Sequence, residues 1–362
     1  MFSHKLNRTD AQTALMENEV PRLTIELTNI CNLHCSYCVR DEDALYNTRA
    51  QFFSPELLQK IIRQAKEVMG ISFVSFTGGE VTIHPQFDKI IETVVDAGLG
   101  FGFVTNGWHF DRVYPLLMKS LQAVRAVAFS LDGTTEELHD NWRGTGSFIR
   151  VMRSITRCNF SGIPFSVKVA IRRDTLPYLQ EFSLMSAKLG AERIDFAHIL
   201  PTSSSLHDEV SLTQNERRDA EHEIAILSNI LKMKVGIATG YHNIDPDAPC
   251  IALRSNEPNI DYRGRLTLCC NLSGYRGAGG EQDVFADLNK DDFRSSYLRL
   301  KAAAELQVKR RKDALETLNR LGQKPDLYTS SPCMFCLQSF DKIPWQSAHS
   351  VKGRMLPVFA AN

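Results

Sequence analysis

Short apolar runs alternate with helical segments as far as residue 199, and this alternation most restricts the folds open to the chain. The runs are rich in β-branched and aromatic residues, as buried strands are: Leu23–Leu27, Ile71–Phe76, Gly100–Val104, Ala126–Leu131, Phe165–Ile171 and Arg193–Ile199. The helices expected between them are Ser54–Met69, Pro85–Ala97, Arg112–Leu121, Ser147–Cys158 and Tyr178–Leu189. Strands that alternate with helices pair in parallel through right-handed crossovers. The sequence therefore predicts an α/β fold, either a complete or partial βα barrel or a doubly wound sheet.

In both architectures the chemistry gathers at the C-terminal ends of the strands. Four polar motifs come directly after or at the end of predicted strands: residues 28–40 (TNICNLHCSYCVR), Thr77–Glu80 (TGGE), Thr105–Gly107 (TNG) and Ser130–Gly133 (SLDG). We therefore expect these motifs to lie together on one rim.

The first of these motifs places Cys31, Cys35 and Cys38 within eight positions, with no fourth cysteine close behind. A structural zinc site uses four ligands, whereas an iron–sulfur cubane has four iron corners. Three cysteines on a cubane would leave one iron open to a substrate or cofactor. The alternatives are a zinc site completed by His34 or by a distant residue, and unrelated buried thiols.

The spacing Cys31-x3-Cys35-x-Tyr37-Cys38 resembles the C-x3-C-x-aromatic-C motif of the radical S-adenosylmethionine (SAM) superfamily. The resemblance implies a partial (β/α)6 barrel, which agrees with the six predicted βα units. It also implies that the three cysteines hold a catalytic [4Fe–4S] cluster, with Tyr37 at the cofactor. In that superfamily the SAM amine and carboxylate chelate the open iron, and reductive cleavage gives a 5′-deoxyadenosyl radical that takes a hydrogen atom from the substrate.

Two further motifs resemble parts of the superfamily's cofactor site. Gly78, Gly79 and Glu80 are similar to its GGE motif, in which adjacent glycines permit close approach and a carboxylate can accept from an ammonium group. Ser130 and Arg143 resemble residues that bind the cofactor's ribose and carboxylate, although Arg143 can equally be a surface arginine beside a turn. Three more polar residues at strand ends are weaker candidates, because such residues also form caps and turns: Asn106, Asp132 and His198.

A second set of cysteines follows after residue 240. The spacing Cys250-x13-Gly264-x4-Cys269, followed by Cys333-x2-Cys336, resembles the motif of the auxiliary-cluster domains called SPASM and Twitch. Together these four cysteines imply a second [4Fe–4S] cluster, and a four-cysteine zinc ribbon is the alternative. The spacing selects Cys269 rather than its neighbour Cys270, which alternation places on the other face of the strand. No cysteine follows residue 336, so one auxiliary cluster is expected, as in the Twitch type.

The predicted elements divide the chain into three parts. Residues 1–20 form an N-terminal extension, residues 21–240 the radical SAM partial barrel, and residues 241–362 the auxiliary-cluster domain. The last part is expected to contain a β-hairpin, from Ile260–Tyr262 and Leu266–Cys270, and a charged helix over about 291–321. The twenty residues before the first strand are too few for a peptide-recognition domain of their own.

Composition restricts the partners. Lys+Arg and Asp+Glu are equal at 42 each, which argues against nucleic acid as a partner. There is no secretory signal and no run of ~20 apolar residues, so we expect a cytoplasmic protein that does not bind a membrane. Cysteines stay mostly reduced in that compartment, where clustered ones are typical metal or redox ligands.

The sequence therefore predicts a radical SAM oxidoreductase or maturase. Oxidative modification or crosslinking of a peptide is the favoured reaction, and oxidation of a small molecule such as an aminocyclitol or sugar is the alternative. A reducing partner such as flavodoxin or ferredoxin is implied, and a separate peptide-recognition protein is compatible with this prediction. The basic segment Lys309–Lys312 can either dock an acidic leader peptide or form a solvated face. A different class, a non-catalytic zinc-binding or electron-transfer protein, would use the same cysteines.

Overall fold

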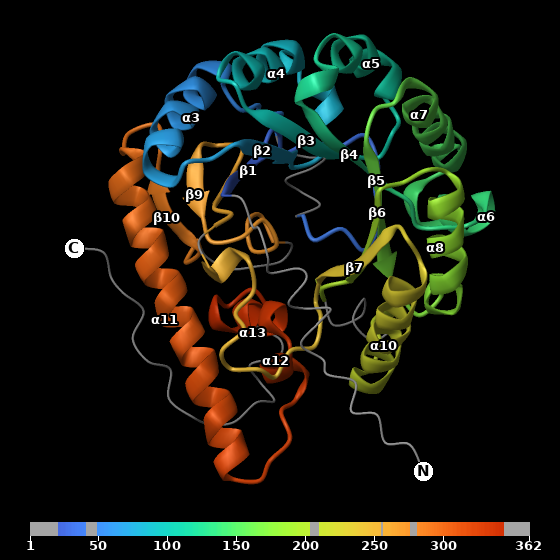
Figure 1. The fold of residues 1–362 in the computed structure, drawn as a ribbon. Coiled ribbons are helices and arrows are strands. Elements are labelled where there is room, and N and C mark those ends of the chain that lie inside the picture. Colours follow the sequence, from blue (N-terminus) through green and yellow to red (C-terminus); the bar gives the residue numbers. More distant parts are fainter. Residues whose placement is uncertain (1–20, 41–48, 203–209, 255, 276–280, 344–362) are drawn as a thin grey trace.

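The computed structural model describes residues 21–40, 49–202, 210–254, 256–275 and 281–343 (Figure 1). These residues form a ten-stranded sheet in the order β10-β9-β8-β1-β2-β3-β4-β5-β6-β7. The first seven strands along the chain are β1 (Arg22–Glu26), β2 (Phe73–Thr77), β3 (Gly100–Thr105), β4 (Val124–Ser130), β5 (Phe165–Ile171), β6 (Arg193–His198) and β7 (Lys234–Thr239). The predicted extension over residues 1–20 lies outside the described residues.

Strands β1 to β7 pair in parallel, each with the next in sequence. The helices of the crossovers cover the outer, convex side of the curved sheet (Figure 1). They are α3 (Pro55–Met69), α4 (Phe87–Asp96), α5 (Phe110–Lys119), α6 (Glu136–Arg143), α7 (Ser147–Ser161), α8 (Leu179–Lys188) and α10 (Gln214–Ile230). The sheet order leaves β7 and β10 at its ends, so the barrel is partial, and the α/β prediction is confirmed.

Helix α3 shows why these segments form where they do. The Ser54 hydroxyl accepts from the main-chain N–H of Leu57 at 3.2 Å, which caps the helix. The side chains of Leu58, Ile61 and Ala65 recur at helical spacing and are fully buried. The apolar stripe thus fixes the helix against the sheet, and the cap fixes its start.

Three of these elements were not predicted. Helix α10 and strand β7 extend the βα pattern beyond the six expected strands, and α6 lies between β4 and α7. The helix expected from Pro85 begins at Phe87, because residues Val81–Ile83 already form a short 3-10 turn, η1, before it.

The C-terminal part continues the same sheet. Strands β8 (Asn259–Ile260) and β9 (Arg265–Thr267) form the predicted hairpin, and Gly264 has a φ of 83° in its turn. Strand β8 also pairs in parallel with β1, and β10 (Val284–Asp287) pairs with β9. The hairpin is therefore joined to the partial barrel by main-chain hydrogen bonds.

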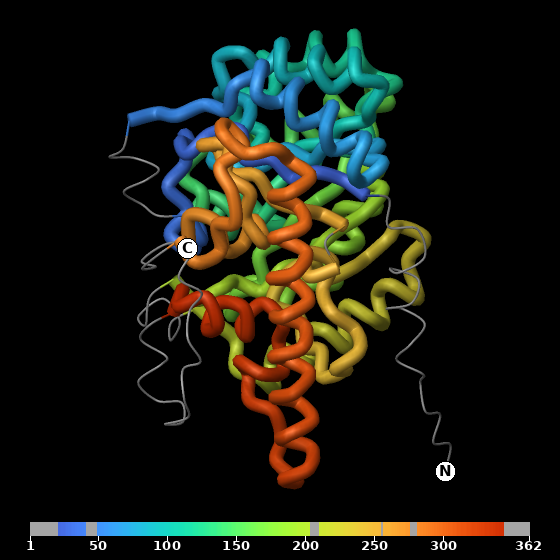
Figure 2. The backbone as a smooth tube through the Cα atoms, turned by 90° about the vertical axis from the view of Figure 1, so that its left-hand side faces the viewer, coloured from blue at the N-terminus to red at the C-terminus, as the bar shows by residue number. Residues whose placement is uncertain are grey.

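Three helices and a short turn complete this part. Helix α11 (Phe293–Arg320) is 28 residues long and runs down one side of the molecule (Figure 2). It packs against α3, against the 3-10 turn η4 (Ala252–Arg254) and against the short helices α12 (Leu327–Ser330) and α13 (Pro332–Ser339). Among the described residues, none of the helices combines the length and the apolar character that crossing a bilayer requires.

Candidate active site

The N-terminal cysteines lie in a loop that follows β1. The loop turns tightly, since the N–H of Cys38 donates to the carbonyl of Cys35 at 3.0 Å. Burial, with smaller contributions from the negative charges of Glu80, Cys35 and Cys38, raises the pKa of Cys31 to about 12. The three sulfurs are thus close enough to repel one another as thiolates. A cationic group bound between them would remove this repulsion, which is the property expected of cluster ligands.

The glycine pair after β2 holds the chain that leads into this loop. The N–H of Gly79 donates to the carbonyl of Thr28, and that of Glu80 to the carbonyl of Ile30, both at 2.9 Å. A Cβ added to Gly79 would stand 1.8 Å from the Ile30 oxygen. The glycines were expected to let the chain approach a ligand. In this structure their close neighbour is the segment immediately before Cys31, so they position the cysteine loop.

Glu80 ties together the ends of two strands. Its side chain is buried and accepts from the hydroxyls of Thr82 and Thr105 at 2.6 and 2.8 Å, and from the N–H of Asn106 at 2.8 Å. Asn106 in turn places its side-chain amide 3.9 Å from the sulfur of Cys31. Both oxygens of Glu80 therefore have partners within the chain. Its role as an acceptor for the cofactor's ammonium group stays a prediction.

Asp132 is the centre of a buried charged cluster beside the cysteine loop. Its carboxylate accepts from the Tyr37 hydroxyl, from Arg143 Nε at 2.5 Å and from the N–H of Ala170 at 2.9 Å. Burial alone would raise the pKa of Asp132, but Arg143 and Arg172 lower it to about 2. The carboxylate thus fixes Tyr37, which stands between two of the cysteines, and Arg143, whose charge reaches Cys35.

Arg143 was predicted to bind the cofactor's carboxylate, and here its Nε pairs with Asp132. Arg172 was not predicted at all. Its guanidinium is fully buried, packs over the rings of Tyr37 and Trp142, and has an Nη1 without a hydrogen-bond partner in the described residues. The sequence did carry one indication of Arg172, because it follows β5 directly. The other candidate polar residues were chosen at the same C-terminal ends of their strands.

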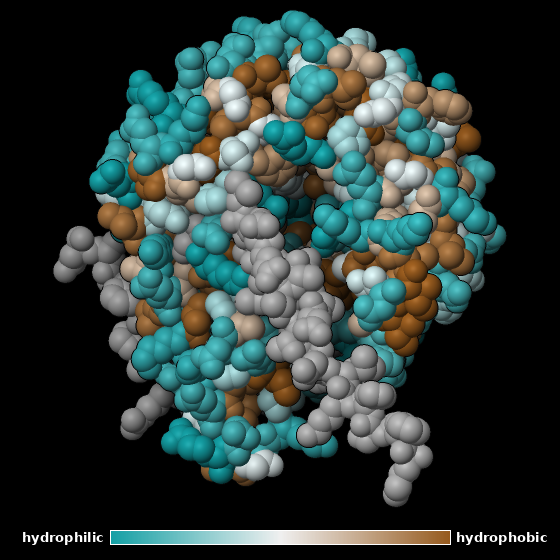
Figure 3. Space-filling view, in the orientation of Figure 1, coloured by the Kyte–Doolittle hydropathy of each residue, from teal (hydrophilic) through white to brown (hydrophobic). Residues whose placement is uncertain are grey.

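The inner side of the sheet carries small and charged side chains. Ser130 lies opposite Lys168 in the strand register, and Lys168 lies opposite Asp195. Lys168 Nζ is 3.3 Å from Asp195 Oδ2, whereas the alternating residues Val167 and Val169 are buried in the core. The face seen in Figure 3 is recessed near its middle, where the curved sheet encloses its interior. Ser130 therefore lies on the inner side of the sheet, and its role as a cofactor ligand stays a prediction. Lys168 is an inner-side charge that the sequence did not indicate.

His198, a weaker candidate, faces the other way. Its Nε2 is 3.2 Å from Oε1 of Glu221 on α10, so the imidazole points between sheet and helix rather than into the interior. Burial and the charge of Arg217 lower the pKa of His198 well below its usual value, and burial raises the pKa of Glu221 to about 7. This side-chain contact joins α10 to the sheet.

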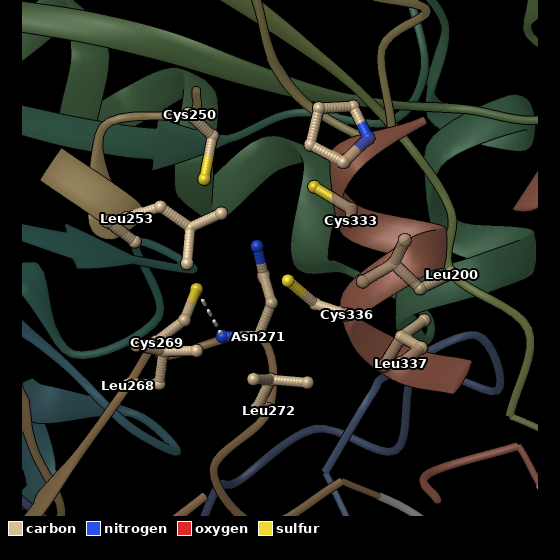
Figure 4. A pocket seen from close by; sticks show the side chains of 12 residues that line it. Leu200, Cys250, Leu253, Leu268, Cys269, Asn271, Leu272, Cys333, Cys336 and Leu337 are labelled. Carbon is tan, nitrogen blue, oxygen red and sulfur yellow. Dashed lines mark hydrogen bonds between the residues drawn. The ribbon is translucent and has the colours of Figure 1, made fainter. Parts of the chain in front are cut away.

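The C-terminal cysteines line one pocket (Figure 4). The pocket has about 350 Å³ of empty volume, part of it open to solvent, and the sulfurs of Cys250, Cys269, Cys333 and Cys336 point into it. We call these four residues the cysteine quartet. Most of the other lining residues are apolar. Cys270 is not among the lining residues, in keeping with the spacing that selected Cys269.

N–H groups surround the sulfurs of the quartet. The main-chain N–H of Asn271 donates to Cys269 and that of Gly240 to Cys333, both at 3.4 Å, and Gln307 Nε2 lies 3.6 Å from Cys336. The main-chain N–H groups of Leu253 and Ala252 donate to the sulfur of Cys250 and oppose the rise in its pKa that burial causes. Donors directed at all four sulfurs are what thiolate ligands require, since hydrogen bonds to sulfur stabilise the charged form.

The quartet leaves the choice between one ion and a cluster open. Four cysteine thiolates can hold either tetrahedral zinc or an iron–sulfur cluster, and all four sulfurs point into the one space. Burial raises the pKa of Cys333 to about 12, so its thiolate needs a bound cationic group.

Arg40 connects the two cysteine sets. It follows Cys38 by two residues, pairs with the buried Glu26 of β1 at 2.8 Å and donates to the carbonyl of Ser273 at 2.7 Å. Ser273 lies in the turn that follows Cys269. The segment after the N-terminal cysteine trio (Cys31, Cys35 and Cys38) is thus joined to the turn that follows Cys269 of the quartet. The sequence did not indicate this contact.

The basic segment Lys309–Lys312 does not form one basic face. Arg311 is buried, Lys309 pairs with Asp313, and Lys312 pairs with Asp247. Docking of a leader peptide on this segment stays a prediction, and only part of its charge is presented to solvent.

Comparison with known proteins agrees with the site. Residues 25–182 match the model of the radical SAM superfamily. The mycofactocin maturase MftC of Mycobacterium tuberculosis is 33% identical over 179 residues, which cover 47% of this chain and 42% of the relative. The PqqA peptide cyclase of Gluconobacter oxydans is 24% identical over 252 residues, 68% of this chain and 69% of the relative. The chain thus spans less than half the length of the maturase.

A solved structure shares the fold. Streptococcus suis SuiB bound to S-adenosylmethionine has a TM-score of 0.62 at 15% identity, covering 75% of this chain and 64% of that one. SuiB bound to its precursor peptide SuiA has a TM-score of 0.60 at 14% identity, covering 77% and 64%. The region that matches the radical SAM model contains Cys31, Cys35 and Cys38, the glycine pair and the Asp132 cluster, so residues 25–182 of this chain are similar to a radical SAM domain.

Proposed function

We propose that this enzyme oxidatively modifies a peptide, using a catalytic [4Fe–4S] cluster on Cys31, Cys35 and Cys38 and an auxiliary cluster on the cysteine quartet. The observation that carries the proposal is the pocket in which four cysteines, far apart in sequence, point their sulfurs into one space (Figure 4). A radical SAM domain alone leaves the reaction open, whereas a second site that can hold an electron favours oxidation.

The chain's own residues prepare the catalytic site. When bound, the cluster and SAM together supply a one-electron cleavage whose 5′-deoxyadenosyl product removes a hydrogen atom from the substrate. The three cysteines leave one iron corner free for the cofactor. Gly79 sets the position of the loop, Asp132 fixes Tyr37 within it, and Ser130 faces the interior in which the substrate would lie.

The quartet supplies four thiolates and so leaves no open iron. Its role is then to carry an electron or to shape the pocket. After the loss of a hydrogen atom, a substrate radical that gives one electron to the auxiliary site and one proton to solvent has undergone a net two-electron oxidation. A one-electron carrier such as flavodoxin or ferredoxin would reduce the catalytic site and can remove the electron from the auxiliary one.

The relatives support a peptide as substrate. The PqqA peptide cyclase is named for a peptide, and SuiB has been solved with its precursor peptide bound. The cyclase is similar to this chain in sequence, and SuiB is similar to it in fold. On the inner side of the sheet, Ser130 and Lys168 offer polar side chains to the main chain of a peptide. A separate recognition protein would then present the peptide.

Counting iron tests the two sites independently. The anaerobically reconstituted chain should be brown and hold about eight irons, and it should release 5′-deoxyadenosine when reduced with SAM. Changing the trio to serine should remove about four irons, and changing the quartet should remove the other four. The matched controls are Cys158→Ser, in the core, and Cys270→Ser, beside the pocket, which should keep about eight. A colourless protein that binds zinc instead would refute the proposal.

Deuterium transfer identifies the substrate. Peptides encoded by short reading frames beside the gene, deuterated at their side chains, should pass deuterium into 5′-deoxyadenosine and lose two hydrogens in the product. Transfer from a sugar or aminocyclitol but from none of the peptides would replace the peptide proposal with small-molecule oxidation.

A further inference from the structure

Helix α11 has an unusual buried face where it passes the cysteine quartet. Its buried positions recur every three or four residues: Phe293, Ser296, Leu300, Ala304, Gln307, Arg311 and Leu315. Gln307 and Arg311 are one turn apart, in the part of the face where a packing helix ordinarily carries apolar side chains. The helix packs here against η4 and α13, which adjoin or carry the cysteines. Two large polar side chains are therefore buried on the face by which this helix packs against elements of the quartet.

Gln307 gives its side-chain N–H to a sulfur. Its side chain is 1% exposed, and Nε2 lies 3.6 Å from the Cys336 sulfur. Its Oε1 is buried without a hydrogen-bond partner in the described residues. Burying an amide with its carbonyl unsatisfied is unfavourable, and a neutral thiol is a weak acceptor in return. The arrangement is favourable when Cys336 is a thiolate bound to a cluster, because hydrogen bonds to charged groups are stronger.

Arg311 brings a positive charge to the same place. Its guanidinium donates to three main-chain carbonyls, those of Asn243, Thr329 (3.3 Å) and Ser330 (3.5 Å). Its side chain is buried, and no carboxylate in the described part of the chain forms an ion pair with it. The groups whose negative forms would favour its charge are the Tyr241 hydroxyl and the thiols of Cys250, Cys336 and Cys333. A buried cation needs a compensating negative charge, and the quartet loaded with a cluster would supply it.

We propose that Gln307 and Arg311 raise the midpoint potential of the auxiliary cluster and so make it a better electron acceptor. Each electron that enters the quartet adds one negative charge to a poorly solvated space. An N–H dipole and a guanidinium beside the sulfurs stabilise this added charge, and hydrogen bonding and net charge are the terms by which a protein adjusts such potentials. The inference rests on the proposed function, since it requires a cluster at the quartet.

The test measures the potential of the auxiliary cluster alone. The full chain with Cys31, Cys35 and Cys38 changed to alanine keeps only the quartet, and its midpoint potential is read by an EPR-monitored redox titration. Gln307→Leu and Arg311→Gln should each lower the midpoint, with the larger shift for Arg311→Gln because a full charge is lost. Arg311→Lys, which keeps the charge, should shift it less.

The matched control lies on the same helix. Lys309→Gln removes one positive charge at a position whose side chain is 70% exposed, where water screens it, so the midpoint should not change. An unchanged midpoint in both Gln307→Leu and Arg311→Gln, with iron retained, would overturn the inference. Loss of the cluster from both variants would also overturn it, because the two residues would then hold the site instead of setting its potential. A parent chain without iron would instead refute the auxiliary cluster itself, and with it the proposed function.

Discussion

At the scale of single residues, Asp132 has the largest predicted effect on stability. Its pKa falls from 3.8 to about 2 in the folded chain, since Arg143 and Arg172 outweigh the effect of burial. A shift of this size corresponds to about 2.5 kcal/mol. Because the folded pKa is depressed, this stabilisation is complete above pH 3.8 and is lost as the pH falls towards about 2.

Asp132→Asn should therefore destabilise the protein by about 3 kcal/mol at pH 7, because it leaves the buried guanidinium of Arg143 without its carboxylate and Arg172 with Asp174 alone. Urea unfolding followed by circular dichroism measures the difference, which should shrink when the experiment is repeated below pH 3.8. Asp111→Asn is the control, since that carboxylate is 76% exposed and pairs with Arg157 at the surface. The control should change the free energy of unfolding by less than about 0.5 kcal/mol. Equal effects of the two substitutions would contradict the role given to Asp132.

Gly79→Ala should empty the catalytic site while sparing the auxiliary one. The new Cβ would stand 1.8 Å from the Ile30 oxygen, so the segment that leads to Cys31 must move. Iron content should fall from about eight to about four per chain, with the spectrum of the remaining cluster unchanged. Gly236→Ala is a matched control in another strand, where the Cβ meets only the end of the flexible Arg193 side chain. Full iron content in Gly79→Ala would show that the glycine does not position the loop.

The site could be predicted in part at this scale. Motif spacing selected both cysteine sets, and the strand-end rule selected Asn106 and Asp132, which the structure places beside Cys31 and Tyr37. The sequence could not show that Arg143 would pair with Asp132, or that Arg172, just after β5, would lie beside the same carboxylate. Such partners depend on which strands are neighbours and on which faces of the elements meet. A local sequence pattern contains no information on either.

At the scale of elements, the cap of α3 has a measurable effect. Ser54→Ala removes the acceptor for the N–H of Leu57 and should lower the free energy of unfolding by about 1 kcal/mol, as measured by urea unfolding. Ser54→Thr keeps a hydroxyl acceptor and should lower it much less. Iron content should be the same in both variants because the cap lies at the outer surface. A loss of iron in Ser54→Ala alone would mean that the start of α3 also supports the cysteine loop.

Two of the elements that the sequence missed lack a clear pattern. Strand β7 lies at the end of the described sheet beside β6, and Gly236 interrupts its short apolar run. Helix α6 buries only His139 among its described residues. Both elements are stabilised by their neighbours more than by their own composition. The six predicted strands were found because each is covered on its outer side and therefore needs an apolar run.

At the scale of the whole molecule, the sheet joins the two predicted domains. The N–H groups of Arg22 and Thr24 in β1 donate to the carbonyls of Asn256 and Pro258 at 3.0 and 3.1 Å. Helix α11 covers α3, and Gln64 of α3 accepts from the first residue of α11 at 3.0 Å. The boundary expected at residue 240 therefore crosses both a strand pairing and a helix interface, whereas independent domains usually share few such contacts.

A chain cut after residue 240 should accordingly fail to fold as a stable unit. Its β1 would present an unpaired edge, and the outer face of α3 would lose the helix that covers it, so association through the exposed edge is expected. Size-exclusion chromatography should show aggregates, and thermal melting should lack the cooperative transition of the full chain. Both measurements are made beside a chain cut after residue 343, which keeps every described element and should behave as the full chain does. A monomeric 1–240 piece with a sharp transition would show that the partial barrel is independent, and that the hairpin and α11 are needed only for the cysteine quartet.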